Sequence, residues 1–109
     1  MVAFVVGIGN YKVIRKLKNP VPDADAIQHL LEAQNVEVVN ARDCDKNELE
    51  QQFEFFLTTL RPGDAAFLFF AGHGTEFRNS VRLMAISESA KPDLEKDAIN
   101  LNVLIARYE

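Results

Sequence analysis

DAAFLFFAGHG, which spans residues 64–74, decides the fold of this chain. Residues 65–71 are wholly apolar, and the turn sequence Pro62-Gly63-Asp64 leads into them. An apolar run of this length between turn residues predicts a strand buried on both faces, as in the centre of a parallel sheet. The run ends abruptly at Gly72-His73-Gly74.

A histidine between two glycines at the carboxyl end of a strand suits a catalytic site. The glycines carry no side chain, so a substrate can approach the imidazole of His73 closely. The N–H of Gly74 can face a developing oxyanion. The alternative is that His73 is an ordinary polar residue ending a strand and that Gly72 and Gly74 are turn glycines. The tripeptide alone leaves both interpretations open.

Two more strands precede this stretch. Residues 2–8 are β-branched and apolar, and they predict a second strand buried on both faces. Residues 36–40 predict a third strand, which Glu37 makes more exposed, as at a sheet edge. Helical segments separate the strands, and right-handed crossovers limit the possible arrangements. The edge-like strand 36–40 is expected beside strand 2–8, with strand 64–71 on the other side of strand 2–8. The loop after Ile8 and the turn at His73 should then share a cleft at the carboxyl ends of the strands.

The two helices have distinct signals. Residues 23–34 predict an amphipathic helix with Asp23 as N-cap, because Pro20 and Pro22 favour a loop before it. Its buried stripe is predicted to be Ile27, Leu30 and Leu31. A second helix is predicted from the Asp45 cap, with Glu48 at capping-box spacing, to about residue 60. One face of that helix carries Leu49, Phe53, Phe56, Leu57 and Leu60.

The last third of the chain is less regular. Alternating residues within 76–87 predict a small hairpin, residues 88–96 a polar linker, and Asn102 the start of a last helix.

Composition narrows the class of protein. At 109 residues the chain is one domain or part of one, and 48% of its residues are hydrophobic. A net charge of −4 and a pI of about 5.2 do not favour a nucleic-acid or membrane partner. One cysteine, Cys44, excludes an internal disulfide framework and a cysteine-rich zinc site. No signal peptide or apolar segment of membrane-spanning length is visible, so we expect a cytoplasmic protein.

Several stretches together resemble the caspase-like cysteine peptidases, nearest to their metacaspase and paracaspase branch. They are VVGIGNY at 5–11, Leu17 with Asp23-Ala24 and Leu30-Leu31, PGDAAFLFFAGHG at 62–74, and INLNVLIARY at 99–108. The resemblance implies a caspase–haemoglobinase-like fold. This is an α/β three-layer sandwich with a mainly parallel sheet, of which residues 1–109 would be the N-terminal portion of one catalytic domain.

The resemblance also implies residue roles. His73 would be the catalytic histidine, paired with a cysteine thiolate, and the Gly74 N–H would help to form the oxyanion hole. Asp23 falls where metacaspases carry an acidic residue of the S1 pocket, which would favour a substrate with Arg or Lys at the cleaved position. The alternative for Asp23 is a helix cap alone. The substrate would be a protein or peptide.

The nucleophile is the main departure from the family. It follows a further strand, so the resemblance implies that a C-terminal segment or a second chain supplies it and that this chain alone is inactive. Cys44 is not expected to substitute, because Asp43 and Asp45 flank it and would raise the pKa of its thiol.

Candidate metal ligands in the sequence do not form a recognisable site. The segment from Asp43 resembles a calcium loop, but its sixth residue is Glu48 rather than glycine. His29, His73 and Cys44 lack zinc-site spacing. We therefore expect no cofactor, although the resemblance allows calcium without indicating its ligands. One alternative is a pseudo-peptidase that docks partners through the open edge of the third strand. Another is an unrelated flavodoxin-like binding domain.

Overall fold

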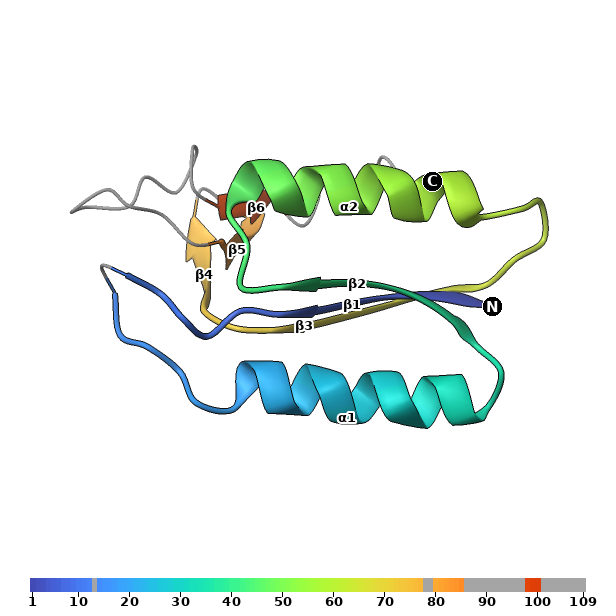
Figure 1. Cartoon of the computed structure of the whole chain (residues 1–109). Helices are drawn as coiled ribbons and strands as arrows, with labels where there is room; N and C mark the ends of the chain where they lie inside the picture. Colours follow the sequence, from blue (N-terminus) through green and yellow to red (C-terminus); the bar gives the residue numbers. More distant parts are fainter. Residues whose placement is uncertain (13, 78–79, 86–97, 101–109) are drawn as a thin grey trace.

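A parallel sheet lies between two helices in the computed structural model, which describes residues 1–12, 14–77, 80–85 and 98–100 (Figure 1). The sheet has the order β2-β1-β3. Its strands are β1 (Val2–Gly7), β2 (Glu37–Arg42) and β3 (Ala66–Ala71). Helix α1 (Pro20–Ala33) covers one face and α2 (Lys46–Thr59) the other. The predicted α/β three-layer class and strand order are confirmed.

Strand β1 is the central strand because both of its faces are apolar. All six of its residues are buried. Successive side chains point to opposite faces, so Val2, Phe4 and Val6 pack in the cluster that includes the buried residues of α2. Ala3 and Val5 pack on the other face with Ala24 of α1. The two cores therefore meet at β1.

Strand β3 corrects one prediction, since it lies at an edge of this sheet and is not buried on both faces. Phe67 and Leu68 are 38% and 40% exposed. The first residue, Ala66, and the carboxyl half are better covered, with Phe69 against the α1 cluster and Phe70 against the α2 cluster. An apolar run marks a strand of a parallel sheet, but it does not show whether other elements cover both of its faces.

Helix α1 begins earlier than predicted. Its N-cap is Asn19, and the N–H of Asp23 donates to the Asn19 carbonyl at 2.8 Å as the first helical hydrogen bond. Pro20 fits at the first helical position because an N–H there would have no partner within the helix. Leu30 was also assigned wrongly, since it is 57% exposed. The inward face instead follows Ala24, with Ile27 and Leu31 partly buried beside it.

Helix α2 matches its prediction. The Asp45 side chain accepts a hydrogen bond from the Glu48 N–H at 2.8 Å, which is the predicted cap. Leu49, Phe53 and Phe56 are buried on the face that meets the sheet. The Phe4 and Phe56 rings stack with their centroids 5.4 Å apart.

Beyond His73 the chain forms a second sheet of order β4-β5-β6, from β4 (Gly74–Phe77), β5 (Ser80–Met84) and β6 (Ala98–Asn100). The predicted hairpin is confirmed, although it begins already at Gly74, and β6 was not predicted. Strand β2 also runs two residues further than expected. The predicted linker and last helix lie outside the described residues. Within the described ranges, no helix is long and apolar enough to cross a membrane.

Candidate active site

The site forms where β1 and β3 end side by side (Figure 1). The Ile8 N–H donates to the Ala71 carbonyl at 2.9 Å, so the pairing continues one residue past β1. The loop after β1 and the turn at His73 therefore leave the sheet together, as the sequence predicted. This end of a parallel sheet is where ligands of such folds bind.

His73 is held through its ring by the loop that follows β1. Its Nε2 lies 2.7 Å from the carbonyl oxygen of Arg15. A carbonyl oxygen only accepts hydrogen bonds, so Nε2 carries the proton of the neutral ring. The basic nitrogen is then Nδ1, which is the atom that could take a proton from a nucleophile.

Tyr11 holds the same residue from inside the protein. Its side chain is 1% exposed, and its Oη accepts a hydrogen bond from the His73 N–H at 2.9 Å. The two rings pack with centroids 4.7 Å apart and planes 58° apart. Burial raises the pKa of Tyr11 to about 12, so the phenol stays protonated at neutral pH. Sequence reasoning missed Tyr11; the available signal was an aromatic residue with a polar tip directly after the strand end.

Gly72 makes this contact possible. A Cβ atom added there would lie 2.8 Å from the Tyr11 Oη and 3.0 Å from the Ile8 carbonyl oxygen. The absent side chain therefore makes room for Tyr11, whereas the sequence interpretation reserved that room for a substrate. Gly74 is exposed and begins β4.

Asp43, at the end of β2, ties the loop after β1 to the sheet. Its Oδ1 accepts hydrogen bonds from the N–H groups of Gly9 at 2.8 Å and Asn10 at 3.0 Å. Its own N–H donates to the Gly7 carbonyl at 3.0 Å. Asp43 adopts a positive φ of 45°, which is uncommon for a residue other than glycine. Sequence reasoning weighed Asp43 only as a calcium ligand and a neighbour of Cys44.

The loop itself is closed by further hydrogen bonds. The Leu17 N–H donates to the Gly9 carbonyl at 2.8 Å. The Lys16 ammonium donates to the Tyr11 carbonyl at 2.9 Å and to the Asn10 Oδ1 at 3.0 Å. These bonds fix the stretch that contains both contacts to His73.

Comparison with known proteins assigns this chain to a family. The family model described as caspase domain, Peptidase_C14, matches residues 1–104. The chain belongs to the caspase-domain family. It is also 36% identical over 80 residues to the human mucosa-associated lymphoid tissue lymphoma translocation protein 1. That match covers 72% of this chain and 10% of the human protein, so the chain corresponds to a small part of its relative. The resemblance seen in the motifs is confirmed, and the flavodoxin-like alternative is wrong.

In this caspase domain Asp23 lies in the first turn of α1 and is exposed. That turn packs tightly against the end of β1: a Cβ atom on Gly7 would lie 2.7 Å from the Pro20 carbonyl oxygen and 2.8 Å from the Ala24 Cβ. Asp23 is therefore at the same end of the sheet as His73. Because the N-cap is Asn19, capping does not account for an aspartate at position 23. Its role in an S1 pocket stays a prediction.

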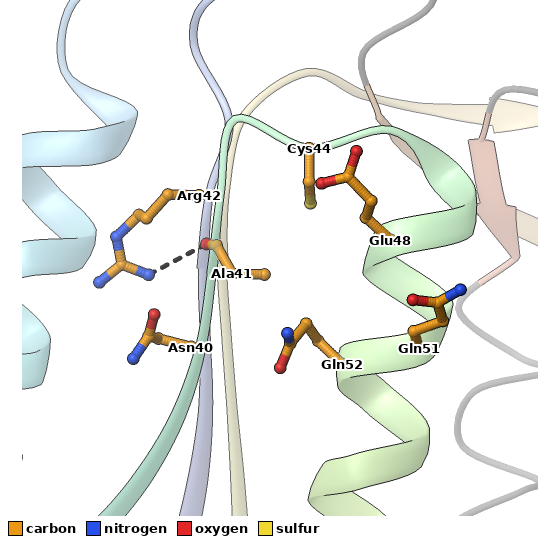
Figure 2. A pocket seen from close by; sticks show the side chains of 7 residues that line it. All are labelled: Asn40, Ala41, Arg42, Cys44, Glu48, Gln51 and Gln52. Atoms are coloured by element: carbon orange, nitrogen blue, oxygen red, sulfur yellow. Dashed lines mark hydrogen bonds between the residues drawn. The ribbon is translucent and has the colours of Figure 1, made fainter.

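Cys44 lies elsewhere in the caspase domain. It faces a cavity of about 320 Å³ between β2 and α2, with Glu48 and Gln52 beside it (Figure 2). Strand β1 separates β2 from β3, so Cys44 and His73 follow strands that are not neighbours. The thiol is 6% exposed, and burial, followed by the charges of Glu48 and Asp45, raises its pKa to about 11. These properties favour a structural thiol.

No metal centre emerges from the part of the caspase domain that the structure describes, where no three His, Cys, Asp or Glu side chains are grouped to hold an ion. The segment that resembles a calcium loop does not fit calcium. The Asp43 carboxylate already accepts two backbone N–H groups, and the Asp45 carboxylate caps α2. His29 is exposed on α1.

Proposed function

We propose that this chain supplies the histidine half of the catalytic site of a caspase-like cysteine endopeptidase. The observation that carries the proposal is the 2.7 Å contact between His73 Nε2 and the Arg15 carbonyl. It directs the basic Nδ1 away from the loop, as a general base requires. Membership in the caspase-domain family supports peptide hydrolysis as the reaction class.

The nucleophile is proposed to come from a cysteine outside these 109 residues, in a C-terminal segment or a second chain. Cys44 is the chain's one cysteine, and its raised pKa and its position after β2 are unfavourable for attack. This chain alone is then expected to be inactive.

In the proposed reaction, Nδ1 of His73 accepts the proton of the incoming cysteine thiol. The thiolate attacks the carbonyl carbon of the scissile peptide bond, and the N–H of Gly74 donates to the oxyanion that forms. The imidazolium then gives its proton to the leaving amine as the C–N bond breaks. Water hydrolyses the thioester that remains, with His73 again acting as the base.

The test uses the natural protein that contains this sequence. We expect cleavage of peptides with Arg or Lys at the cleaved position, measured beside Asp peptides and both with calcium and with a chelator. His73→Ala should lower kcat by about 10²–10⁴-fold, because the general base is lost. His29→Ala, which removes the chain's other histidine from the exposed face of α1, should retain activity. Absence of cleavage, or cleavage that His73→Ala leaves intact, would contradict the proposal.

Asp23 is proposed to set the preference for basic substrates. Asp23→Asn should lower kcat/KM for Arg peptides by at least about tenfold, since a charge-assisted contact is lost. Asp25→Asn is the matched control, because Asp25 lies two residues further along α1 and pairs with Arg42 at 3.0 Å. Equal effects of the two variants would exclude the pocket role.

A second candidate is a pseudo-peptidase that acts by docking. The exposed Phe67 and Leu68 on edge strand β3 favour it. In that case His73→Ala would leave the cellular phenotype intact, whereas replacing Phe67 by Asp would abolish it.

A further inference from the structure

We propose that Tyr11 is a positioning residue for His73 and that Asp43 in turn positions Tyr11. The inference rests on the proposed function for its catalytic meaning, but the arrangement itself is a property of this chain. None of the motif interpretations assigned a role in the site to Tyr11 or Asp43.

Two hydrogen bonds from the loop after β1 position His73. The Tyr11 Oη binds its backbone N–H, and the Arg15 carbonyl binds its Nε2. A hydrogen bond to the backbone alone leaves both side-chain torsions of a histidine free. A hydrogen bond to the ring alone leaves the backbone free. Together with the ring contact at 4.7 Å, the two hydrogen bonds fix which direction Nδ1 faces.

Tyr11 is suited to this role by its burial. Tyr11 is 1% exposed, so its ring is packed by protein and its hydroxyl is shielded from bulk water. Removing the hydroxyl would leave the partly buried His73 N–H without its acceptor, and an unsatisfied donor of this kind is unfavourable. Gly72 lies close to the hydroxyl, since a Cβ atom at that position would be 2.8 Å from it.

Asp43 connects the end of β2 to the segment that carries Tyr11. Its carboxylate binds the N–H groups of the two residues preceding Tyr11 along the strand exit, Gly9 and Asn10. Its backbone lies in the left-handed region, which is uncommon for residues other than glycine, although aspartate adopts it more often than most. Such outliers gather at functional sites, which favours a role beyond connecting β2 to α2.

The test is NMR of the natural protein that contains this sequence, with the signals read at His73. In Tyr11→Phe we expect the His73 amide to exchange with solvent at least tenfold faster, and the ring-nitrogen signals to show a mixture of tautomers. The amides of β1 should stay protected, which shows that the fold persists. His29 provides an internal reference in every spectrum, because it is exposed on α1.

Asp43 is tested by a conservative pair. Asp43→Ala should change the His73 ring signals as Tyr11→Phe does, whereas Asp43→Asn keeps an oxygen acceptor and should restore them. Asp45→Asn is the matched control, since it removes the same charge two residues away, where the carboxylate accepts the Glu48 N–H at the start of α2. If Asp43→Ala does not fold, Tyr11→Phe and Asp43→Asn still decide the outcome.

Unchanged His73 signals in Tyr11→Phe would overturn the proposal, as would equal changes in Asp43→Ala and Asp45→Asn. These spectra need no substrate or nucleophile. Failure of the peptidase assay therefore leaves this result standing, and failure here leaves the assay standing.

Discussion

His73 Nε2 lies 2.7 Å from the carbonyl oxygen of Arg15, so a backbone atom 58 residues away along the chain determines which ring nitrogen carries the proton. The contact joins the loop after the central strand to the turn after the edge strand. With the proton on Nε2, Nδ1 is the ring nitrogen that can accept one.

The first prediction concerns that protonation state. In the neutral form of His73 we expect the Nε2–H tautomer to dominate, because the carbonyl oxygen can only accept. Long-range ¹H–¹⁵N spectra of the ring nitrogens measure it directly. His29, on the exposed face of α1, should instead show the tautomer mixture of a histidine in water. Dominance of the Nδ1–H form at His73 would contradict the assignment.

Cys44 is predicted to be unreactive in the folded chain. A pKa of about 11 instead of 9.0 makes the thiolate on the order of 100-fold scarcer at neutral pH, and burial restricts access further. Alkylation by iodoacetamide should therefore be at least that much slower than for the same chain in denaturant. Glu48→Gln should speed alkylation, since it removes a charge that raises the pKa. Equal alkylation rates in folded and unfolded chains would contradict the burial and the raised pKa of Cys44.

Stability is predicted to fall in alkaline solution. The folded pKa values of Cys44 and Tyr11 are raised to about 11 and about 12, so the folded state retains their protons after the unfolded chain has lost them. Their stabilising effect is complete below the unfolded values of 9.0 and 10.0 and is lost as pH rises through the folded values.

The slope should reach about 1.4 kcal/mol per pH unit for each group. Urea unfolding at pH values from 8 to about 11 measures it. Cys44→Ala should remove the part of the slope that begins near pH 9.0, the pKa of this thiol in the unfolded chain. A free energy of unfolding that does not change over this range would contradict both pKa shifts.

The α2 core offers a matched pair of phenylalanines. Phe53 is fully buried against Phe4 and Phe56, whereas Phe55 on the same helix is 58% exposed. Phe53→Ala should lower the free energy of unfolding by about 3–5 kcal/mol through the lost burial and the cavity left behind. Phe55→Ala should change it by less than about 0.5 kcal/mol. Chemical denaturation followed by circular dichroism distinguishes them, and similar losses would mean that α2 packs by another face.

The helix starts give a further contrast. Asp45→Ala should destabilise the chain by about 1 kcal/mol, because the carboxylate that accepts the Glu48 N–H is lost. Asp23→Ala should have a smaller effect, since the N-cap of α1 is Asn19. Unfolding midpoints of the two variants, compared at equal ionic strength, test this. A larger loss of unfolding free energy for Asp23→Ala would contradict this and support Asp23 as the N-cap, as the sequence predicted.

The sequence predicted most of the fold because its strongest signals are local. Apolar runs marked the three parallel strands, and the Asp45 cap marked the start of α2. The strand order was also predicted correctly. The apolar run of β3 did not show that Phe67 and Leu68 are exposed, since exposure depends on which elements cover the sheet. Pro20 was assigned to a loop because proline breaks helices, although in the first turn it loses no hydrogen bond. Leu30 was placed inward by a spacing that also fits its exposed face.

The sequence pointed to only some of the residues of the candidate site, for a similar reason. His73 stood out between its glycines, and Asp23 and Gly74 followed from family resemblance. Tyr11 and Asp43 gave no comparable signal, because their importance lies in contacts across 62 and 34 residues. Sequence periodicity reports the neighbours of a residue within its own element, and these contacts join three different strand ends.

The Arg15 carbonyl has an evolutionary consequence. Every amino acid carries this atom, so the arginine side chain can drift to any other type while the acceptor remains, and alanine scanning would pass over it. Loop length is the vulnerable property: an insertion or deletion between Gly9 and Leu17 would move the carbonyl away from the ring. Genetic variation at this site should therefore tolerate substitutions at position 15 but not changes in the number of residues around it.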